Sequence, residues 1–332
     1  MAPARVVGAV VVGLLVLAGL FILSIAIGAN NMPLDSVWRG LTADSTERDT
    51  LPEAIIVWQL RMPRTLLAIA AGAALAVAGV VMQALTRNPL AEPGLLGVNS
   101  GAAFAVVCAT LFLGITDASR YVWFAFAGAA AVACLVYVVS VRRMTRSDRV
   151  HLVLVGAAIS AALSSCTGVL TMSHTDVFNS YRFWVIGSTA DRGYDVLMPL
   201  LPLFLTGFVL AFAAGPALNA MALGDEQAQA LGVRLAAARS VSLLAITLLC
   251  GATTAACGPI SFVGLAIPHM LRLLVGVDQR RLLVFSLLTG PSFLLGADII
   301  GRVAAAGELE VGIVTAFLGA PVLIAILLRK VR

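Results

Sequence analysis

The run at residues 65–85 reads TLLAIAAGAALAVAGVVMQAL and carries no charged side chain. A helix rises about 1.5 Å per residue, so a run of this length crosses a bilayer core of about 30 Å. The bilayer offers no water to backbone N–H and C=O groups, which must therefore bond inside a helix or a closed barrel. The apolar residues are continuous and do not alternate with polar ones, which excludes a barrel and predicts a membrane-spanning helix.

Nine further apolar runs repeat this pattern along the chain. Of the 332 residues, 60% are hydrophobic and 12% are charged. A soluble domain has about 25% charged residues, so a soluble protein with buried helices is disfavoured. The sequence therefore predicts an all-α integral membrane protein with about ten transmembrane helices. The other runs are at residues 6–28, 93–114, 121–141, 152–172, 196–214, 240–256, 259–277, 282–297 and 311–328.

The first run follows Arg5 and could be taken for a signal peptide. It is longer than the apolar part of a signal peptide, so we expect a retained helix. The eighth and ninth runs are short or interrupted by Pro and Gly, so their ends are the least defined. Outside the runs we expect a short helix near residues 33–40 and an amphipathic segment at 177–186.

The distribution of charge orients the ten spans. With the N-terminus in the cytoplasm, the inside segments hold 14 of the 22 basic residues and five of the 17 acidic ones, a net charge of +9 against −4 outside. Cytoplasmic loops carry the excess of Lys and Arg, so both ends of the chain are predicted to be cytoplasmic. Residues 1–332 then form a single transmembrane domain with external segments at 29–60 and 173–195 and a cytoplasmic segment at 219–234. This topology accounts for the positive charge without a nucleic-acid partner.

Several kinds of chemistry have no sequence support. Lys330 is the single lysine, and no G-x-x-x-x-G-K-[ST] phosphate loop occurs. No H-E-x-x-H motif, paired-Cys metal site or G-x-S-x-G motif occurs either, so we expect no enzyme, no catalytic residue and no bound metal or other cofactor on this chain. The spans contain almost no Asp, Glu or His, which weakens an ion-coupled secondary carrier but leaves it open. A membrane scaffold without transport activity is a further alternative.

Five motifs are more specific than membrane packing requires. They are RMPRTL at 61–66, GVVMQALTRNPLAEPGLLGV at 79–98, GPISFVGLAIPHMLR at 258–272, ADIIGR at 297–302 and LGAPV at 318–322. Together they strongly resemble the FecCD family of ABC importer permeases, which carry ferric siderophores, haem and cobalamin. The likeness runs from about residue 22 to the C-terminus. Residues 86–90, 182–184 and 297–302 look most like ferric-enterobactin permeases, although cobalamin permeases share much of the pattern.

The resemblance implies the type II ABC importer permease fold and a set of partners. These are a second permease, either a copy or a paralogue, two ABC ATPase subunits that bind ATP and Mg²⁺, and an external substrate-binding protein or lipoprotein. The implied location is the cytoplasmic (inner) membrane of a bacterium. The implied cargo is a ferric siderophore, with cobalamin or haem as the alternatives.

Residues 219–234 are the expected site of ATPase coupling. Gly224 and Gly232 bracket a short helix with two acids in its first turn, where the positive end of the helix dipole favours them. We expect Ala228 and Leu231 to form a small apolar face on this helix. By resemblance this is the coupling helix, with the contact residues Leu223, Gly224, Asp225, Glu226, Ala228, Leu231 and Gly232.

Two further sites follow from the resemblance. The first, on the outer side, consists of the arginines that pair with acids of a binding protein. Because the planar guanidinium grips a carboxylate with two N–H groups, Arg suits this role. These docking residues are Arg61, Arg64 and Arg302. The second is a cytoplasmic gate formed by Asn88, Pro89, Leu90, Thr145 and Ser147. An outer gate near residues 172–178 is also expected.

Overall fold

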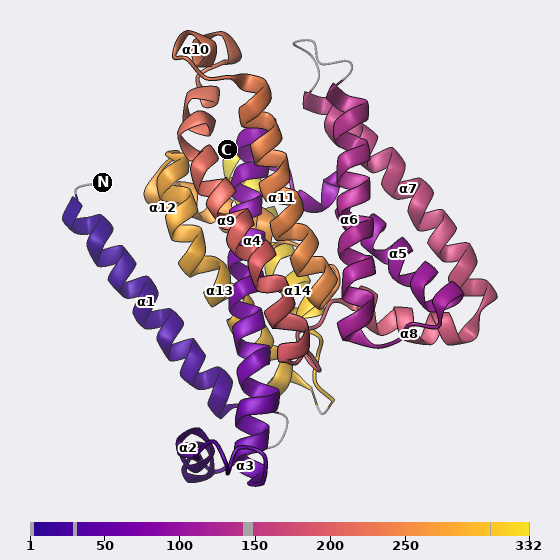
Figure 1. Ribbon diagram of the computed structural model, residues 1–332. Coiled ribbons are helices and arrows are strands. Elements are labelled where there is room, and N and C mark those ends of the chain that lie inside the picture. Colours follow the sequence, from indigo (N-terminus) through magenta and orange to yellow (C-terminus); the bar gives the residue numbers. More distant parts are fainter. Residues whose placement is uncertain (1–2, 29–31, 142–148, 306, 332) are drawn as a thin grey trace.

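The chain folds into helices that run between two ends of the molecule (Figure 1). The structure is a computed structural model that describes residues 3–28, 32–141, 149–305 and 307–331. Within these ranges the chain forms helices and no strand. The elements are α1 (Pro3–Ala26), α2 (Leu34–Thr42), α3 (Pro52–Ile55), the π-helix η1 (Ile56–Arg61), α4 (Met62–Thr86), the 3₁₀-helix η2 (Pro93–Leu96), α5 (Val98–Leu113), α6 (Ala118–Val141), α7 (Arg149–Ser173), α8 (Thr175–Ile186), α9 (Tyr194–Ala222), α10 (Asp225–Ala230), α11 (Leu235–Cys257), α12 (Val263–Val275), α13 (Gln279–Ala304) and α14 (Val311–Val331).

The ten predicted spans are confirmed as helices. Among the described residues, seven helices are long and apolar enough to cross a membrane, and three shorter apolar helices complete the set of expected runs. The short ones are Val98–Leu113, Val263–Val275 and Val311–Ile324. Figure 1 shows α10 at one end of the bundle and α2 with α3 at the other. We call these the α10 end and the α2 end; the charge distribution predicts that they are cytoplasmic and external.

Helix α4 is the centre of the bundle. Helices α9, α11, α12 and α13 pack around it (Figure 1), and every residue at positions 71–86 is buried. A Cβ atom on Gly79 would lie 1.9 Å from the carbonyl oxygen of Gly264 in α12, and one on Gly72 would lie 2.6 Å from that of Gly290 in α13. Small residues allow this close approach of helix backbones, which is how helices associate in a membrane.

Several helix ends differ from the sequence prediction. Helix α13, expected to end at residue 297, continues to Ala304, and α9, expected to end at 214, continues to Ala222. The run expected to begin at residue 65 is one continuous helix from Pro52 to Thr86 through α3, η1 and α4. The prediction placed these ends next to Asp298, Arg64 and the Gly215–Pro216 pair, but the structure carries the helices through all of them.

The eighth span is shorter than its apolar run. We expected residues 259–277, but α12 covers only Val263–Val275. Gly258 and Phe262 have φ values of +74° and +70°, so the backbone before the helix is left-handed and cannot be helical there. Helix α12 starts against the second half of α4, where Gly264 meets Gly79.

Two groups of helices form opposite flanks of the bundle (Figure 1). Helix α1 forms one flank and packs mainly on α13. Helices α5 to α8 form the other. The short helix expected near 33–40 is confirmed as α2, and the amphipathic segment expected at 177–186 lies in the helix α8.

Candidate functional site

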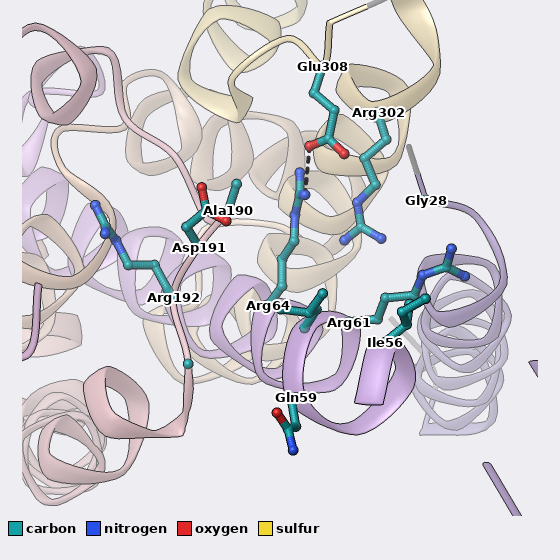
Figure 2. Close-up of a pocket in the computed structure, with 12 residues that line it drawn as sticks. Gly28, Ile56, Gln59, Arg61, Arg64, Ala190, Asp191, Arg192, Arg302 and Glu308 are labelled. Carbon is teal, nitrogen blue, oxygen red and sulfur yellow. Dashed lines mark hydrogen bonds and ion pairs between the residues drawn. The ribbon is translucent and has the colours of Figure 1, made fainter. Parts of the chain in front are cut away.

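A cavity of about 510 Å³ lies at the α2 end (Figure 2). Its walls come from η1 and α4, from the segment at residues 187–193 between α8 and α9, and from α13 and the connection to α14. The charged side chains in the lining are Arg61, Arg64, Arg192, Arg302, Asp191 and Glu308. With four arginines and two carboxylates, the lining has a net positive charge.

The carboxylate of Asp298 connects three of these chain segments. Its Oδ1 accepts hydrogen bonds from Nε and Nη2 of Arg64, at 3.1 and 2.9 Å, and from Oγ1 of Thr189, at 2.8 Å. Its Oδ2 accepts from Arg302. The Asp298 side chain is 0% exposed, so its charge has no access to water. A buried charge persists when it is paired and hydrogen-bonded, and these donors meet both conditions.

The outer end of α1 is held by two arginines. Nη1 of Arg61 donates two hydrogen bonds, of 2.7 and 2.8 Å, and Nη1 of Arg302 donates two, of 2.7 and 2.9 Å. The last carbonyl groups of a helix have no partner within the helix, and cations there also suit its dipole. Both arginines therefore cap α1. The four acceptors are the carbonyl oxygens of Ser24, Ile25, Ala26 and Ile27.

The structure brings the three predicted docking arginines to one cavity. Arg61 and Arg302 are only 5% and 4% exposed, because the carbonyls of α1 engage them. Arg64 lies at the cavity wall, where its Nη1 donates to Oε2 of Glu308 at 2.8 Å (Figure 2). Whether these side chains contact a binding protein stays a prediction.

Sequence reasoning did not single out the opposite wall of the cavity. Figure 2 shows residues 190–192 across the cavity from Arg64. Asp191 has a φ of +54°, and Gly312 N donates to the carbonyl of Gly187 at 2.9 Å, which fixes the segment against α14. The polar composition of residues 187–193 was the available signal. Nothing in the sequence indicated that Asp191, which is not a glycine, would adopt a positive φ.

A second cavity, of about 300 Å³, shares the 190–192 wall and lies against α8. The rings of Tyr181 and Trp184 stack at 6.4 Å in its lining, and the guanidinium of Arg192 lies 5.7 Å from the Tyr121 ring. Burial raises the pKa of the Tyr181 hydroxyl. The outer gate expected near residues 172–178 falls at the junction of α7 and α8, where Met172 is exposed.

Helix α10 projects at the opposite end of the molecule (Figure 1). Gly224 and Gly232 have φ values of +134° and +84°, and Asp225 and Glu226 occupy the first turn, as predicted. The expected apolar face is not continuous. Ala228 is fully buried toward the bundle, whereas Leu231 is 66% exposed.

The carboxylate of Asp225 ties α10 to two long helices. Its Oδ1 accepts from Nη2 of Arg87 at 2.8 Å, and its Oδ2 accepts from Nη2 of Arg239 at 3.0 Å. Arg87 follows the last residue of α4 and also donates to the carbonyl of Met221 at the end of α9. Helices α4, α10 and α11 therefore meet at this carboxylate, and Arg87 adds the end of α9.

The predicted gate residues begin beside this junction. Arg87 has a φ of +51°, which ends α4. In the next turn Oδ1 of Asn88 accepts from the N–H of Leu90 at 2.9 Å, and Pro89 lies between them. Leu90 is exposed. The other two gate residues, Thr145 and Ser147, lie outside the described residues.

The loop between α4 and η2 also bonds to the residue before α12. Oε1 of Glu92 accepts from the N–H of Phe262, the residue before α12, at 3.0 Å. Burial raises the pKa of the Glu92 carboxyl above its ordinary value, although the Phe262 N–H lowers it. The loop after α4 is thus bonded at both its ends, to α10 through Arg87 and to α12 through Glu92.

Comparisons with known proteins identify relatives across nearly the whole chain. Residues 14–329 match the FecCD transport family. The chain is 44% identical to the ferric enterobactin transport system permease protein FepD of Escherichia coli (strain K12), over 93% of this chain and 92% of the relative. It is 43% identical to the vitamin B12 import system permease protein BtuC of Yersinia enterocolitica, over 83% of this chain and 82% of the relative.

A solved structure has the same fold. It is described as an inward-facing conformation of a metal-chelate type ABC transporter. The two chains superpose with a TM-score of 0.83 and 29% sequence identity, and the match covers 99% of each. The arrangement of helices around α4 is therefore that of an ABC transporter permease.

Proposed function

The chain belongs to the FecCD transport family, and from this premise we propose that it forms the membrane pathway for a ferric siderophore in an ATP-driven importer. It is a multi-pass permease of the bacterial cytoplasmic membrane. The family match over residues 14–329 carries the transport function. The assignment of a ferric siderophore as the cargo rests on the similarity to the ferric enterobactin permease. This similarity extends over more of the chain than the similarity to the vitamin B12 permease.

Transport by the reconstituted complex tests the substrate. We expect uptake of a ferric catecholate siderophore into proteoliposomes that contain this permease, its partner ATPase and its binding protein. Cobalamin and haem are the competing cargoes, and uptake of either in preference to the siderophore would refute the assignment. Uptake driven by an ion gradient, without the ATPase and ATP, would instead support a secondary carrier.

ATP is proposed to bind on partner subunits. The chain has one lysine, Lys330, and no phosphate-binding loop. We therefore assign ATP and Mg²⁺ to two ABC ATPase subunits at the α10 end. A second permease, either a copy or a paralogue, would complete the pathway, and a binding protein would deliver cargo at the α2 end.

Helix α10 is the proposed contact with the ATPase. Leu223 and Leu231, at its two ends, are 67% and 66% exposed, so they can enter a cleft on a partner. Ala228 and Asp225 face the bundle instead, where Asp225 bonds to Arg87 and Arg239. A push on α10 would therefore reach the end of α4 through Arg87. The gate residues Asn88, Pro89 and Leu90 directly follow, so the same push would move the proposed cytoplasmic gate.

The two roles of α10 can be separated by substitution. Leu231→Glu should weaken ATPase binding, because it places a charge on the contact surface. Asp225→Asn should leave binding intact and lower the cargo moved per ATP hydrolysed. Arg87→Gln should do the same, and the double variant should lose less than the sum of the two single losses, because both substitutions remove the Arg87–Asp225 pair. Full coupling in the Asp225→Asn variant would refute this path.

The cavity at the α2 end is the proposed docking site for acidic residues of a binding protein. Arg64 is the docking arginine at the cavity wall, while Arg61 and Arg302 hold α1 and shape the site. Arg64→Glu should weaken docking, more so at low salt, because charge interactions are screened by ions. Arg39→Glu, the same charge reversal at an exposed arginine of α2 at the same end, is the matched control. Equal affinity of the Arg64→Glu variant and the wild type would count against the site.

A further inference from the structure

Helix α2 is fixed to the bundle by one face. Ser36, Val37 and Gly40 are its buried residues. Val37 packs in a small apolar cluster with Ile25 of α1 and Val57 of η1. These contacts fix the rotation of α2 about its own axis, so its other faces point in defined directions.

A second face of α2 is apolar and uncovered. Leu34 and Trp38 are four residues apart, so they lie one above the other on the helix surface. They are 76% and 68% exposed, although both side chains are large and apolar. Leu41 lies on the same side of the helix and is half-buried. The three side chains form an apolar strip along the helix.

The third face of α2 is charged. Nη2 of Arg39 donates to Oδ2 of Asp35 at 3.1 Å, and both side chains are exposed. Each of these residues follows a residue of the apolar strip, so the charged face is turned from the strip by about 100°. The helix thus presents a protein face, an apolar face and a charged face in turn around its axis.

The neighbouring helix indicates what covers the apolar strip. Helix α1 spans the membrane on the flank opposite α7 and α8 (Figure 1), and α2 lies at its outer end on the same flank. Because α1 packs on the bundle by one side only, its other side faces acyl chains. Helix α2, which carries the apolar strip, therefore lies at the outer end of the surface that α1 exposes to the lipid. The large exposed side chains of α1 are Val7, Val11, Val12, Leu14, Leu15, Val16, Ile22 and Leu23.

We propose that α2 lies in the outer interface of the bilayer, with Leu34 and Trp38 among the lipids and the Asp35–Arg39 pair toward water. Tryptophan is favoured at this depth because its ring is apolar and its N–H is polar. Short amphipathic helices bind the interface in the same orientation. The Asp35 and Arg39 charges cancel, so burial of apolar surface holds the helix there and anionic lipid is not required. The proposal rests on the membrane location and not on the cargo.

Tryptophan fluorescence of the full-length permease in nanodiscs tests this placement. The difference between the wild type and Trp38→Phe gives the emission of Trp38 alone. In phosphatidylcholine discs we expect this emission to be blue-shifted from that of an indole in water and insensitive to iodide. Discs made with brominated acyl chains should remove most of it. Added phosphatidylglycerol or salt should change neither result.

Two further variants sharpen the measurement. The difference between the wild type and Trp123→Phe gives the emission of Trp123, which is exposed near the start of the span α6 and serves as the reference for a ring at the end of a membrane span. Leu34→Asp places a charge in the strip, so it should shift the Trp38 emission to the red and open it to iodide.

The outcomes distinguish the possible occupants. Emission that iodide quenches and brominated lipid does not would overturn the proposal. Protection from iodide that appears only after the binding protein is added would assign the strip to that protein. Protection that appears only in the assembly with a second permease would assign it to that chain. Either result would also refute insertion into the membrane.

Discussion

Asparagine in place of Asp298 keeps the size of the side chain but removes its charge. The guanidinium groups of Arg64 and Arg302 would then lose their shared carboxylate, and the Arg302 side chain is only 1% exposed. Removing one partner of a buried ion pair costs about 3–5 kcal/mol, because the remaining charge has neither water nor a counter-ion. Glu308 still pairs with Arg64 at 2.8 Å, so we expect the lower part of that range, about 3–4 kcal/mol.

This loss is large enough to measure by thermal unfolding. At about 2.1 cal/mol/K per residue, a chain of 332 residues unfolds with an entropy of about 0.7 kcal/mol/K. The expected fall in Tm is therefore about 4–6 °C. Helices that persist in detergent lower the unfolding entropy, which would make the shift larger. The assay is the melting of the purified permease in detergent, followed by intrinsic fluorescence.

Asp35→Asn is the matched control for Asp298→Asn. Asp35 also pairs with an arginine four residues later, but the two side chains are 72% and 65% exposed. An exposed pair contributes less than about 1 kcal/mol, so its Tm should fall by about 1 °C or less. Equal shifts in the two variants, or no shift in Asp298→Asn, would refute the claim that burial makes the Asp298 network stabilising.

Three other substitutions test the bundle and its polar connections. Gly79→Val should abolish folded permease, because its Cβ would meet the backbone of Gly264, while Gly8→Val, in open space on α1, should be tolerated; the yield of monodisperse protein compares them. Glu92→Gln should flatten the pH dependence of Tm: burial raises the folded pKa of Glu92, so the wild type loses stability as the pH rises through that value, and an unchanged slope would contradict this. Gly224→Val should lower uptake without lowering the amount of permease in the membrane, because its φ of +134° is strained for valine; normal uptake would exclude a role for the α10 turn.

The number of spans was predictable because each is a continuous apolar run. Continuity depends only on local sequence, and the bilayer enforces a helix for any run long enough to cross it. The turn at α10 was also local, since Gly224 and Gly232 mark the two ends of the helix. The family motifs predicted that the chain is an importer permease, and the comparisons confirm this prediction.

The networks that join the helices were not predictable. Asp298 directly follows the apolar run at residues 282–297, and only the fold shows that Arg64 neutralises its carboxylate and Thr189 bonds to it inside the bundle. The partners of Asp225 could not be predicted either, because Arg87 lies 138 residues away in the sequence. The apolar face expected on α10 is not continuous for a related reason. Residues 228 and 231 are three positions apart and were expected on one face, but the bundle covers only residue 228.

The arginine caps of α1 also have a consequence for biogenesis. Helix α1 enters the membrane first, yet one of its two caps, Arg302, is 278 residues further along the chain than Ser24. Arg61 is available once the second span is made, but the Asp298–Arg302 pair requires the ninth. Until α13 is inserted, the outer end of α1 therefore has only one of its two arginine caps, Arg61. A nascent chain that stops before α13 should carry a first helix that quality-control proteases can reach, and completion of the ninth span would end that exposure.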